Sequence, residues 1–83
     1  MDGTEREMIV RMQQGEEEAF SWLFQKYQSR VLRMAYLISG NYADSEDILQ
    51  ETFVKCYTYR RHLKDPEKFE SWLCQIMTRT AWR

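Results

Sequence analysis

The feature that most constrains the fold is a long apolar stripe in the first half of the chain. Apolar side chains recur there at steps of three and four residues: Phe20, Leu23, Phe24, Tyr27, Val31, Met34, Ala35 and Ile38. This period places side chains on one side of an α-helix. The glutamates Glu16 to Glu18 precede the stripe, at the end where a helix dipole favours negative charge, and Gly40 is a typical stop signal. The sequence therefore predicts one long amphipathic helix from Glu16 to about Ser39.

A shorter helix is expected before this segment. Thr4 is followed three residues later by Glu7, which is the spacing of a capping box. Gly15 provides an end signal, so the helix should run from about Thr4 to Gln14. Its short apolar face consists of Met8, Ile9 and Met12.

Two more helices are expected after the long one. Asn41 is a candidate N-cap for a helix from about Tyr42 to Leu63. After a short cationic connector, Asp65-Pro66 combines a cap residue with a proline at the first helical position, which predicts a fourth helix. One face of this helix consists of Phe69, Trp72, Leu73, Ile76 and Thr80. No C-cap signal precedes Arg83, so we expect the fourth helix to run to Arg83, where the chain looks cut.

Four amphipathic helices with short connections predict an all-α fold, a small bundle of four helices. A chain of 83 residues has room for a single domain, which we expect to span residues 1–83. Hydrophobic residues make up 43% of the sequence, with only three Gly and one Pro, which excludes a disordered chain. The sequence has neither a run of roughly 18 apolar residues nor a signal-peptide core, so we expect a cytoplasmic protein without membrane insertion.

Catalytic and metal chemistry have little support in the sequence. Cys56 and Cys74 lack the CxxC spacing of zinc sites, and His62 is the only histidine that could join them. The sequence contains no phosphate-binding glycine loop and no HExxH or GxSxG pattern. Tyr57 or Tyr59 could act as a nucleophile on nucleic acid, but no metal–carboxylate or Arg–His group accompanies them. We therefore expect no enzyme activity, no metal and no cofactor.

The third predicted helix has two different sides. At about 100° per residue, its inward side consists of Leu49, Phe53, Cys56 and Leu63. Its opposite side consists of Asp47, Gln50, Glu51, Val54 and Thr58. An apolar residue with a rim of carboxylates and an amide is typical of a partner-binding patch, and the carboxylates match a partner rich in arginine. The alternative is a solvated helix face on which Gln and Glu are simply good helix formers.

The charge of the chain changes sign near Thr52. Residues 1–51 contain ten acids and five bases, whereas residues 52–83 contain seven bases and three acids. The stretch between Thr52 and Lys64 has no acid and combines cations with tyrosines: Lys55, Tyr57, Tyr59, Arg60, Arg61, His62 and Lys64. Cations neutralise phosphates and aromatic rings stack on unpaired bases, so this stretch and Lys68 predict contact with nucleic acid. Basic residues that only complement a helix dipole, or a chance distribution of charge, are the alternatives.

Trp72 has two interpretations. It lies on the inward face of the fourth predicted helix, where core packing is the default. Because it is close to the basic connector, its ring edge could also serve as a wedge or a stacking platform for a base. We therefore include Trp72 among the candidate nucleic-acid contacts.

Three stretches of the sequence resemble a known family. The stretches are AFSWLFQKYQSRVLRMAYLISG, DILQETFVKCY and FESWLCQIM. In this order and spacing they resemble the second conserved region of the bacterial extracytoplasmic-function (ECF) RNA polymerase sigma factors. The most specific element, Asp-x-x-Gln-Glu-x-Phe, corresponds to Asp47, Gln50, Glu51 and Phe53. It is followed at the expected distance by an aromatic pair in Phe69-x-x-Trp72-Leu73. The resemblance extends from about Glu16 to Arg83.

The resemblance implies a sigma region 2 domain, which acts in transcription initiation and performs no covalent chemistry. In this family the helix with Asp-x-x-Gln-Glu docks on the arginine-rich clamp helices of the β′ subunit of core RNA polymerase. Asp47, Gln50 and Glu51 are therefore expected to contact polymerase. Val54 would be an apolar addition to this contact, and Phe53 would belong to the core.

The family also captures a flipped base of the promoter minus-ten element, on the single-stranded non-template strand, in the loop between its third and fourth helices. Here that loop corresponds to about His62 to Lys68, flanked by Tyr59, Arg60 and Arg61. The helix-turn-helix domain (region 4) that reads the minus-thirty-five element is absent from this sequence. We therefore expect weak promoter binding by this chain alone, at about 10⁻⁴ to 10⁻⁶ M.

An anti-sigma factor is a further partner that the resemblance implies, since members of the family are commonly held by such regulators. Two departures from the family pattern occur in the fourth predicted helix. Cys74 stands where an aromatic residue often follows Trp-Leu, and Arg79 stands where Asn is frequent. The alternative to a sigma domain is a helical module that binds protein partners only.

Overall fold

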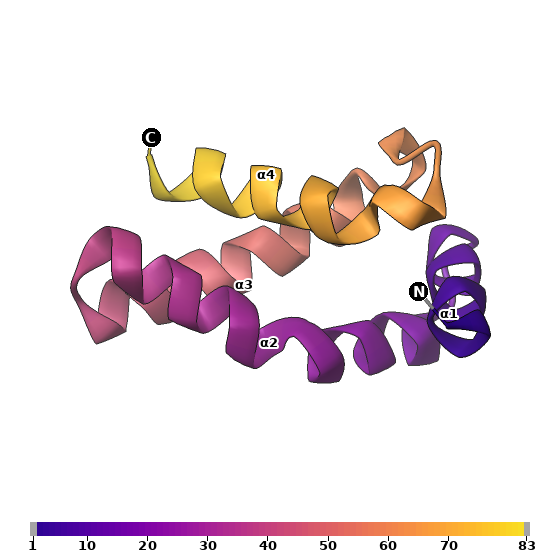
Figure 1. Cartoon of the computed structure of the whole chain (residues 1–83), viewed down its shortest axis with the longest axis horizontal. Coiled ribbons are helices and arrows are strands. Elements are labelled where there is room, and N and C mark those ends of the chain that lie inside the picture. Colours follow the sequence, from indigo (N-terminus) through magenta and orange to yellow (C-terminus); the bar gives the residue numbers. More distant parts are fainter. Residues whose placement is uncertain (1, 83) are drawn as a thin grey trace.

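The computed structural model describes residues 2–82. These residues contain no strand and form four α-helices and two short 3-10 helices (Figure 1): α1 (Gly3–Gln13), α2 (Glu17–Ser39), α3 (Tyr42–Thr58), η1 (Arg60–His62), η2 (Pro66–Lys68) and α4 (Phe69–Ala81). The all-α bundle expected from the sequence is confirmed. None of the helices in this part of the chain has the length and apolar character needed to cross a membrane.

The start of α1 corrects one prediction. The N-cap is Asp2, whose side chain accepts a hydrogen bond from Glu5 N at 2.8 Å, so Thr4 lies inside the first turn. The predicted capping box of Thr4 and Glu7 is therefore wrong, and Glu7 instead lies 3.7 Å from Arg11. An aspartate satisfies the unpaired amides at least as well as a threonine, and the helix dipole favours its negative charge.

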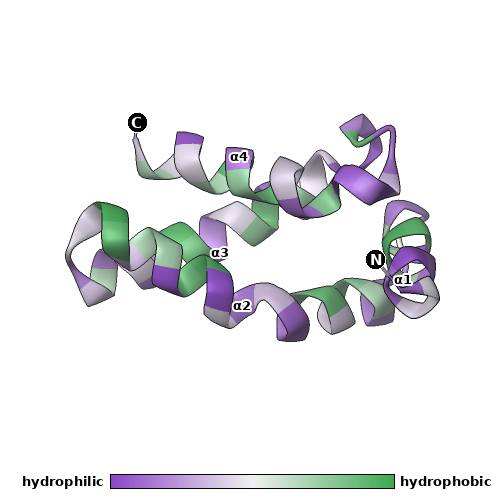
Figure 2. Cartoon of the chain, viewed as in Figure 1, coloured by the Kyte–Doolittle hydropathy of each residue, from purple (hydrophilic) through white to green (hydrophobic). Residues whose placement is uncertain are grey.

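α2 contains the apolar stripe predicted between Phe20 and Ile38. The residues buried along it are Ala19, Leu23, Tyr27, Val31 and Ala35. Gly40 ends the helix at φ 67°, a left-handed conformation that favours glycine, and its N–H donates to Tyr36 O at 2.8 Å. Hydrophobic and hydrophilic residues alternate along the helices in Figure 2, as amphipathic helices require.

α3 ends earlier than the sequence predicts. The predicted helix reaches Leu63, whereas α3 ends at Thr58 and the chain continues as η1. The side-chain amide of Gln13, in α1, donates hydrogen bonds to the carbonyls of Arg60 at 3.0 Å and of Leu63 at 2.7 Å. A contact from a distant part of the chain thus satisfies carbonyls near the helix end, and no local pattern contains it. Leu63 is nevertheless buried, as predicted.

α4 begins at Phe69 and not at Pro66. The predicted cap residue is confirmed, because the Asp65 carboxylate accepts a hydrogen bond from Glu67 N at 3.0 Å. The turn that it caps is the 3-10 helix η2, and the α-helical pattern starts only after this turn. The predicted end of the helix at Arg83 lies outside the described residues.

One apolar core lies between the four α-helices. Aromatic rings meet there edge to face, with centroids 5.4 Å apart for Tyr27 and Phe69 and 4.9 Å apart for Phe24 and Phe53. The inward side predicted for the third helix is confirmed, since all of its members are buried: Leu49, Phe53, Cys56 and Leu63. α1 lies across the end of the bundle where α2 begins, next to the segment that connects α3 and α4 (Figure 1).

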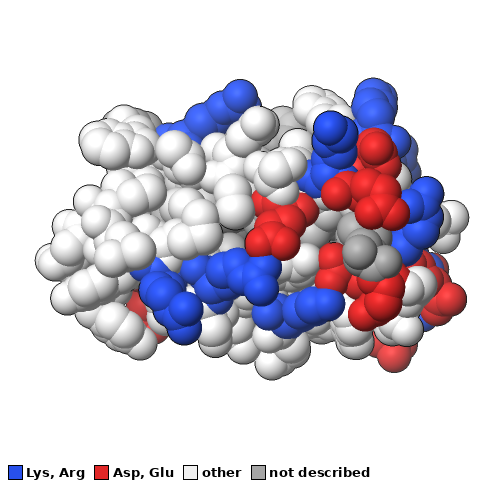
Figure 3. Space-filling model, viewed as in Figure 1, with Lys and Arg blue, Asp and Glu red and all other residues white. Residues whose placement is uncertain are grey.

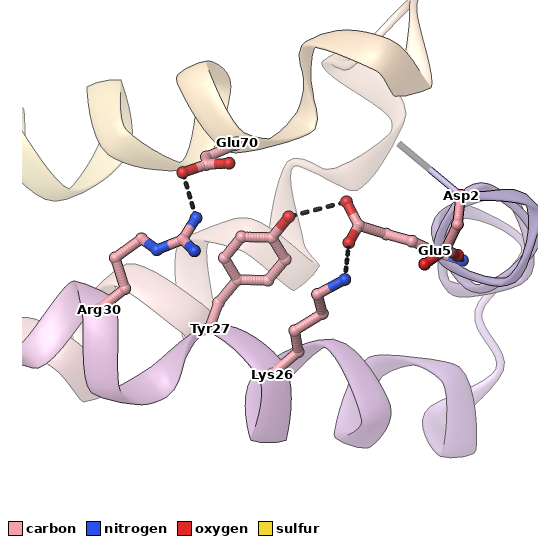
Figure 4. A network of polar contacts seen from close by, with 6 residues as sticks. All are labelled: Asp2, Glu5, Lys26, Tyr27, Arg30 and Glu70. Carbon is pink, nitrogen blue, oxygen red and sulfur yellow. Dashed lines mark hydrogen bonds and ion pairs between the residues drawn. The ribbon is translucent and has the colours of Figure 1, made fainter.

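A polar network fixes α1 to α2 (Figure 4). Glu5 is only 6% exposed; it accepts a hydrogen bond from Tyr27 Oη at 2.7 Å and forms an ion pair with Lys26. Burial alone raises the pKa of Glu5, but the hydrogen bonds from Lys26 and Tyr27 outweigh burial, and the pKa lies below its ordinary value. Arg30 of α2 pairs with Glu70 of α4 beside this network.

Charges gather at one end of the molecule on the face shown in Figure 3. Acidic and basic side chains lie close together where α1 packs, and the opposite end is mostly uncharged in this view. One of the ion pairs joins Arg6 of α1 to Glu67 of η2 at 2.9 Å. Both side chains are about half exposed, so the pair contributes at most about 1 kcal/mol.

Candidate functional site

The outward side of α3 forms the first candidate surface. Asn41 caps the helix by accepting a hydrogen bond from Asp44 N at 3.0 Å, which sets where the helix begins. Four predicted side chains then lie on the side away from the core and make up what we call the acidic face: Asp47, Gln50, Glu51 and Val54. Asp47 and Gln50 are exposed, and Val54 is 63% exposed. The predicted outward orientation is confirmed.

Glu51 is the least exposed member of the acidic face. Its carboxylate lies 3.0 Å from Lys55 Nζ, which also donates a hydrogen bond to Thr80 Oγ1 of α4 at 3.1 Å. Lys55 therefore compensates part of the charge of Glu51, although the sequence groups it with the basic stretch. A pair at this spacing contributes only about 0.3–0.5 kcal/mol, so a partner with forked arginine donors can compete with it.

A groove of about 570 Å³ runs beside the acidic face, between α2 and α3. It is lined mainly by Phe20, Phe24, Gln50, Phe53, Val54 and Thr58. Phe20 and Phe24 belong to the predicted apolar stripe, but both are only half-buried and face the groove. The consecutive pair Leu23-Phe24 is the sequence signal that could have revealed the groove. Two adjacent apolar residues widen a helical stripe beyond what one neighbouring helix covers.

The segment from Tyr59 to Lys68 forms the second candidate surface, which we call the basic connector. Its backbone consists of the two 3-10 turns joined by three residues without regular structure. The side chains predicted to contact nucleic acid that are exposed here are Tyr59, Arg61, His62, Lys64 and Lys68. In Figure 2 the segment is almost entirely hydrophilic. The structure therefore brings these side chains to the surface of one short segment.

Tyr57 and Arg60 lie differently from the other predicted nucleic-acid contacts. Tyr57 Oη donates a hydrogen bond to Gly15 O at 3.2 Å, and its ring meets Phe20 edge to face at 5.1 Å. The guanidinium of Arg60 stacks on the Tyr57 ring at 4.3 Å, and its Nη1 donates to Tyr57 O at 2.9 Å. Both residues are half-buried and contact each other and the turn between α1 and α2.

A cavity of about 340 Å³ lies where the basic connector meets α4; we call it the aromatic cavity. It is lined by Lys55, Tyr59, His62, Trp72, Ile76 and Arg79. The rings of Tyr59 and His62 are 5.3 Å apart and tilted by 45°. Trp72 is half-buried, packs 6.1 Å from Phe69 on the core side, and lines the cavity on the other.

Two residues of the aromatic cavity, Ile76 and Arg79, have no binding role predicted from the sequence, whereas Lys55 belongs to the predicted basic stretch. Trp72, Ile76 and Arg79 are separated by four and three residues, so they lie on the same side of α4, and this spacing is the signal for the group. Aromatic faces with cations beside them provide stacking for a base and charge for its phosphate. The cavity therefore has the chemistry that single-stranded nucleic acid requires.

The two thiols are protonated at neutral pH. Cys56 is 1% exposed, and burial raises its pKa to about 12. Burial also raises the pKa of Cys74. Within residues 2–82, His, Cys, Asp and Glu side chains do not come together in any group of three that could hold a metal ion.

Comparison with protein families finds one match that covers most of the chain. The family described as Sigma-70 region 2 matches residues 23–83. The matched range includes the acidic face, the basic connector and α4. It begins inside α2, so α1 lies before it.

Comparison with curated proteins finds relatives that are similar over nearly the whole chain. The ECF RNA polymerase sigma-E factor of Haemophilus influenzae is 33% identical over 79 residues, which are 94% of this chain and 41% of that protein. The ECF RNA polymerase sigma-E factor of Escherichia coli is 32% identical over 80 residues (94% and 40%). The ECF RNA polymerase sigma factor SigW of Bacillus subtilis is 29% identical over 73 residues (88% and 39%). The chain spans about two fifths of the length of these relatives.

Proposed function

The chain belongs to the Sigma-70 region 2 family, and from this membership we propose that it binds core RNA polymerase and the promoter minus-ten element as the region 2 domain of a bacterial ECF sigma factor. The proposed role consists of binding alone: the domain guides polymerase to promoters and holds the displaced DNA strand, without a covalent step. Such a role belongs in the cytoplasm, where polymerase and promoters are found.

The acidic face is the proposed docking site for the β′ clamp helices of core RNA polymerase. The carboxylates of Asp47 and Glu51 can each accept the paired donors of an arginine. Gln50 and Val54 lie both on this face and at the edge of the apolar groove, which gives the patch an apolar centre with a polar rim. Opposite charge on the two partners would also speed their encounter.

The aromatic cavity is the proposed site for a flipped base of the non-template strand. Tyr59, His62 and Trp72 supply rings on which a base can stack, and the cavity volume lies within the range of small-ligand sites. Arg61 and Lys64 lie exposed on the same connector and can neutralise the flanking phosphates. Stacking in the cavity would offset the cost of unpairing, so strand separation needs no ATPase in this chain.

One observation carries the proposal: the two sites lie on different flanks of α3. The groove beside the acidic face is on the flank toward α2, and the aromatic cavity is on the flank toward α4. Val54 lines the first and its neighbour Lys55 lines the second. Polymerase and a single DNA strand could therefore bind at the same time.

Co-elution with core RNA polymerase tests the proposal. The unmodified chain is expected to co-elute with the enzyme, and Glu51→Arg is expected to weaken that binding by about 30- to 100-fold, because a cation would then face arginines. Glu46→Arg is the matched control, since Glu46 is exposed on the same helix but outside the acidic face. Circular dichroism should show the same helical content in all three proteins. Equal co-elution of Glu51→Arg and the unmodified chain would remove the acidic face as the polymerase site.

The groove favours a second candidate function, a helical module that binds protein partners only. Phe20 and Phe24 give it an apolar wall that a partner helix could cover. An anti-sigma factor that binds there would also be compatible with the first proposal, as a competitor of polymerase. A chain that captures a protein partner but neither core polymerase nor single-stranded DNA would support the second function.

A further inference from the structure

Gln13 of α1 contacts the basic connector, and the turn after α1 contacts the end of α3 just before it. The Sigma-70 region 2 match begins at residue 23, so it assigns no role to this part of the chain. Gln13, at the end of α1, donates to carbonyls of the connector region, and Gly15 in the following turn accepts a hydrogen bond from Tyr57 at 3.2 Å. Residues near the start of the sequence thus form hydrogen bonds with a region more than 40 residues later.

The geometry of Gln13 is specific. Its Nε2 lies 3.0 Å from Arg60 O and 2.7 Å from Leu63 O, so the two amide protons of one side chain bind two carbonyls. Arg60 is the first residue of η1 and Leu63 is the residue that directly follows it. The amide therefore joins the two ends of this turn.

η1 needs such support because it is short. A 3-10 turn of three residues has poor hydrogen-bond geometry of its own, and its last carbonyls require donors from elsewhere. Arg61 and His62 lie within η1, and Tyr59 directly precedes it. The rings that Tyr59 and His62 contribute to the aromatic cavity therefore depend on the shape of this turn.

Gln13 itself is held by a rigid helix. Ile9 and Met12 of α1 are fully buried in the core, and Glu5 is tied to α2 by Lys26 and Tyr27. A side chain on such a helix can hold a neighbouring segment in place with little freedom of its own.

We propose that Gln13 is a positioning residue for DNA capture: its amide holds η1 in the shape that presents Tyr59, Arg61 and His62 to a single DNA strand. The proposal rests on the proposed function of the basic connector. Gln13 is half-buried behind the connector and touches its backbone, so its effect on DNA reaches the strand through η1.

Substitution of Gln13 tests this role, with the neighbouring Gln14 as a matched control, because Gln14 is exposed and is the same residue type. Gln13→Met keeps the length of the side chain and removes its donors. Gln13→Glu places a carboxylate against two carbonyl oxygens, and Gln14→Glu makes the same charge change one residue away. The probe is a fluorescein-labelled single-stranded DNA of mixed sequence at low salt, and anisotropy reports binding to the full chain.

We expect Gln13→Met to weaken DNA binding by about 5- to 10-fold and Gln13→Glu to weaken it more, with Gln14→Glu within about 2-fold of the unmodified chain. Co-elution with core RNA polymerase should be unchanged in every variant. Amide NMR shifts should move at His62 to Lys64 and stay constant along α3. A role in overall stability alone would instead lower both binding activities together.

Three results would count against the inference. Equal DNA binding by Gln13→Met and the unmodified chain overturns the positioning role and leaves the proposed function intact. A parallel loss of DNA and polymerase binding also overturns it, because it assigns Gln13 to general stability. Failure of the unmodified chain to bind single-stranded DNA overturns the proposed function, and the positioning role falls with it.

Discussion

The acidic face and the basic connector differ in what holds them in place. The acidic face consists of side chains on one regular helix, and the Asn41 cap and the buried side of α3 are enough to orient it. The basic connector consists of short turns whose carbonyls depend on Gln13, 47 and 50 residues away in the sequence. A surface on a helix can thus be formed by local interactions, whereas a surface on a connector depends on the rest of the fold.

This difference has a consequence for local stability. The ion pair that Glu51 of the acidic face forms with Lys55 joins residues one helical turn apart. The connector's contacts with α1 instead join distant parts of the chain: Gln13 binds the carbonyls of Arg60 and Leu63, and Arg6 pairs with Glu67. Segments with few regular hydrogen bonds open at lower free energy than core helices, so we expect the connector to open before α3 does.

The largest effect is expected for Phe69→Ala. Phe69 is fully buried at the start of α4, directly after the connector, and its ring packs on Tyr27. Removing the ring should lower the free energy of unfolding by about 3–5 kcal/mol, a large part of the stability of a small domain. Urea unfolding followed by circular dichroism measures the loss. Hydrogen exchange should increase more in the connector and α4 than in α3; an equal increase in all three would show that the two surfaces are one cooperative unit.

A smaller effect is expected where the connector meets DNA. Arg61→Ala with Lys64→Ala should weaken binding of single-stranded DNA by roughly 10-fold and lower the salt slope of log K by about 1.4, which corresponds to two lost phosphate contacts. Arg60→Ala should change the slope less and the melting temperature more, because Arg60 stacks on Tyr57. The measurement is anisotropy at several salt concentrations. An unchanged slope in the double variant would mean that these cations are only solvated.

The smallest effect is expected for the network that anchors α1. The pKa of Glu5 is lower in the folded chain than its ordinary value of 4.5. The ionised carboxylate therefore contributes its full stabilisation of the fold above pH 4.5, and this contribution is lost as the pH falls through the folded pKa. Glu5→Gln should cost about 1 kcal/mol at pH 7, since Lys26 is partly exposed, and should flatten the stability curve below about pH 4.5.

Thermal melts of Glu5→Gln and of the exposed control Glu18→Gln, between acidic and neutral pH, measure this dependence. If Glu18→Gln flattens the stability curve at acidic pH as much as Glu5→Gln does, Glu5 has no special part in the pH dependence of stability. In the comparison of the two surfaces, Glu5→Gln should affect DNA binding more than polymerase binding, because α1 contacts the connector through Gln13 and Arg6.

Local patterns in the sequence predict most of the fold and the whole acidic face. The stripe from Phe20 to Ile38 specifies α2, and angular spacing alone places Asp47 and Val54 on the side of α3 away from the core. These predictions succeed because helical geometry repeats every few residues. The resemblance to sigma factors is confirmed by the family match over residues 23–83.

The remaining features depend on contacts that no local pattern contains. Gln13 binds carbonyls just beyond the early end of α3 at Thr58, and the half-buried Arg60 stacks on Tyr57. The groove depends on how much of the α2 stripe its neighbours cover, which leaves Phe20 partly open. The nucleic-acid roles given to Tyr57 and Arg60 stay predictions, and the structure shows that both also have internal contacts.

The burial of Cys56 gives this domain a built-in reporter of unfolding. Its thiol is 1% exposed and carries the pKa of about 12 that burial imposes, so alkylating reagents should modify it only when the core opens. With Cys74 replaced by serine, the rate of alkylation would give the fraction of molecules that are open at any moment. The same measurement on a sample bound to polymerase would show how far polymerase slows the opening of the core.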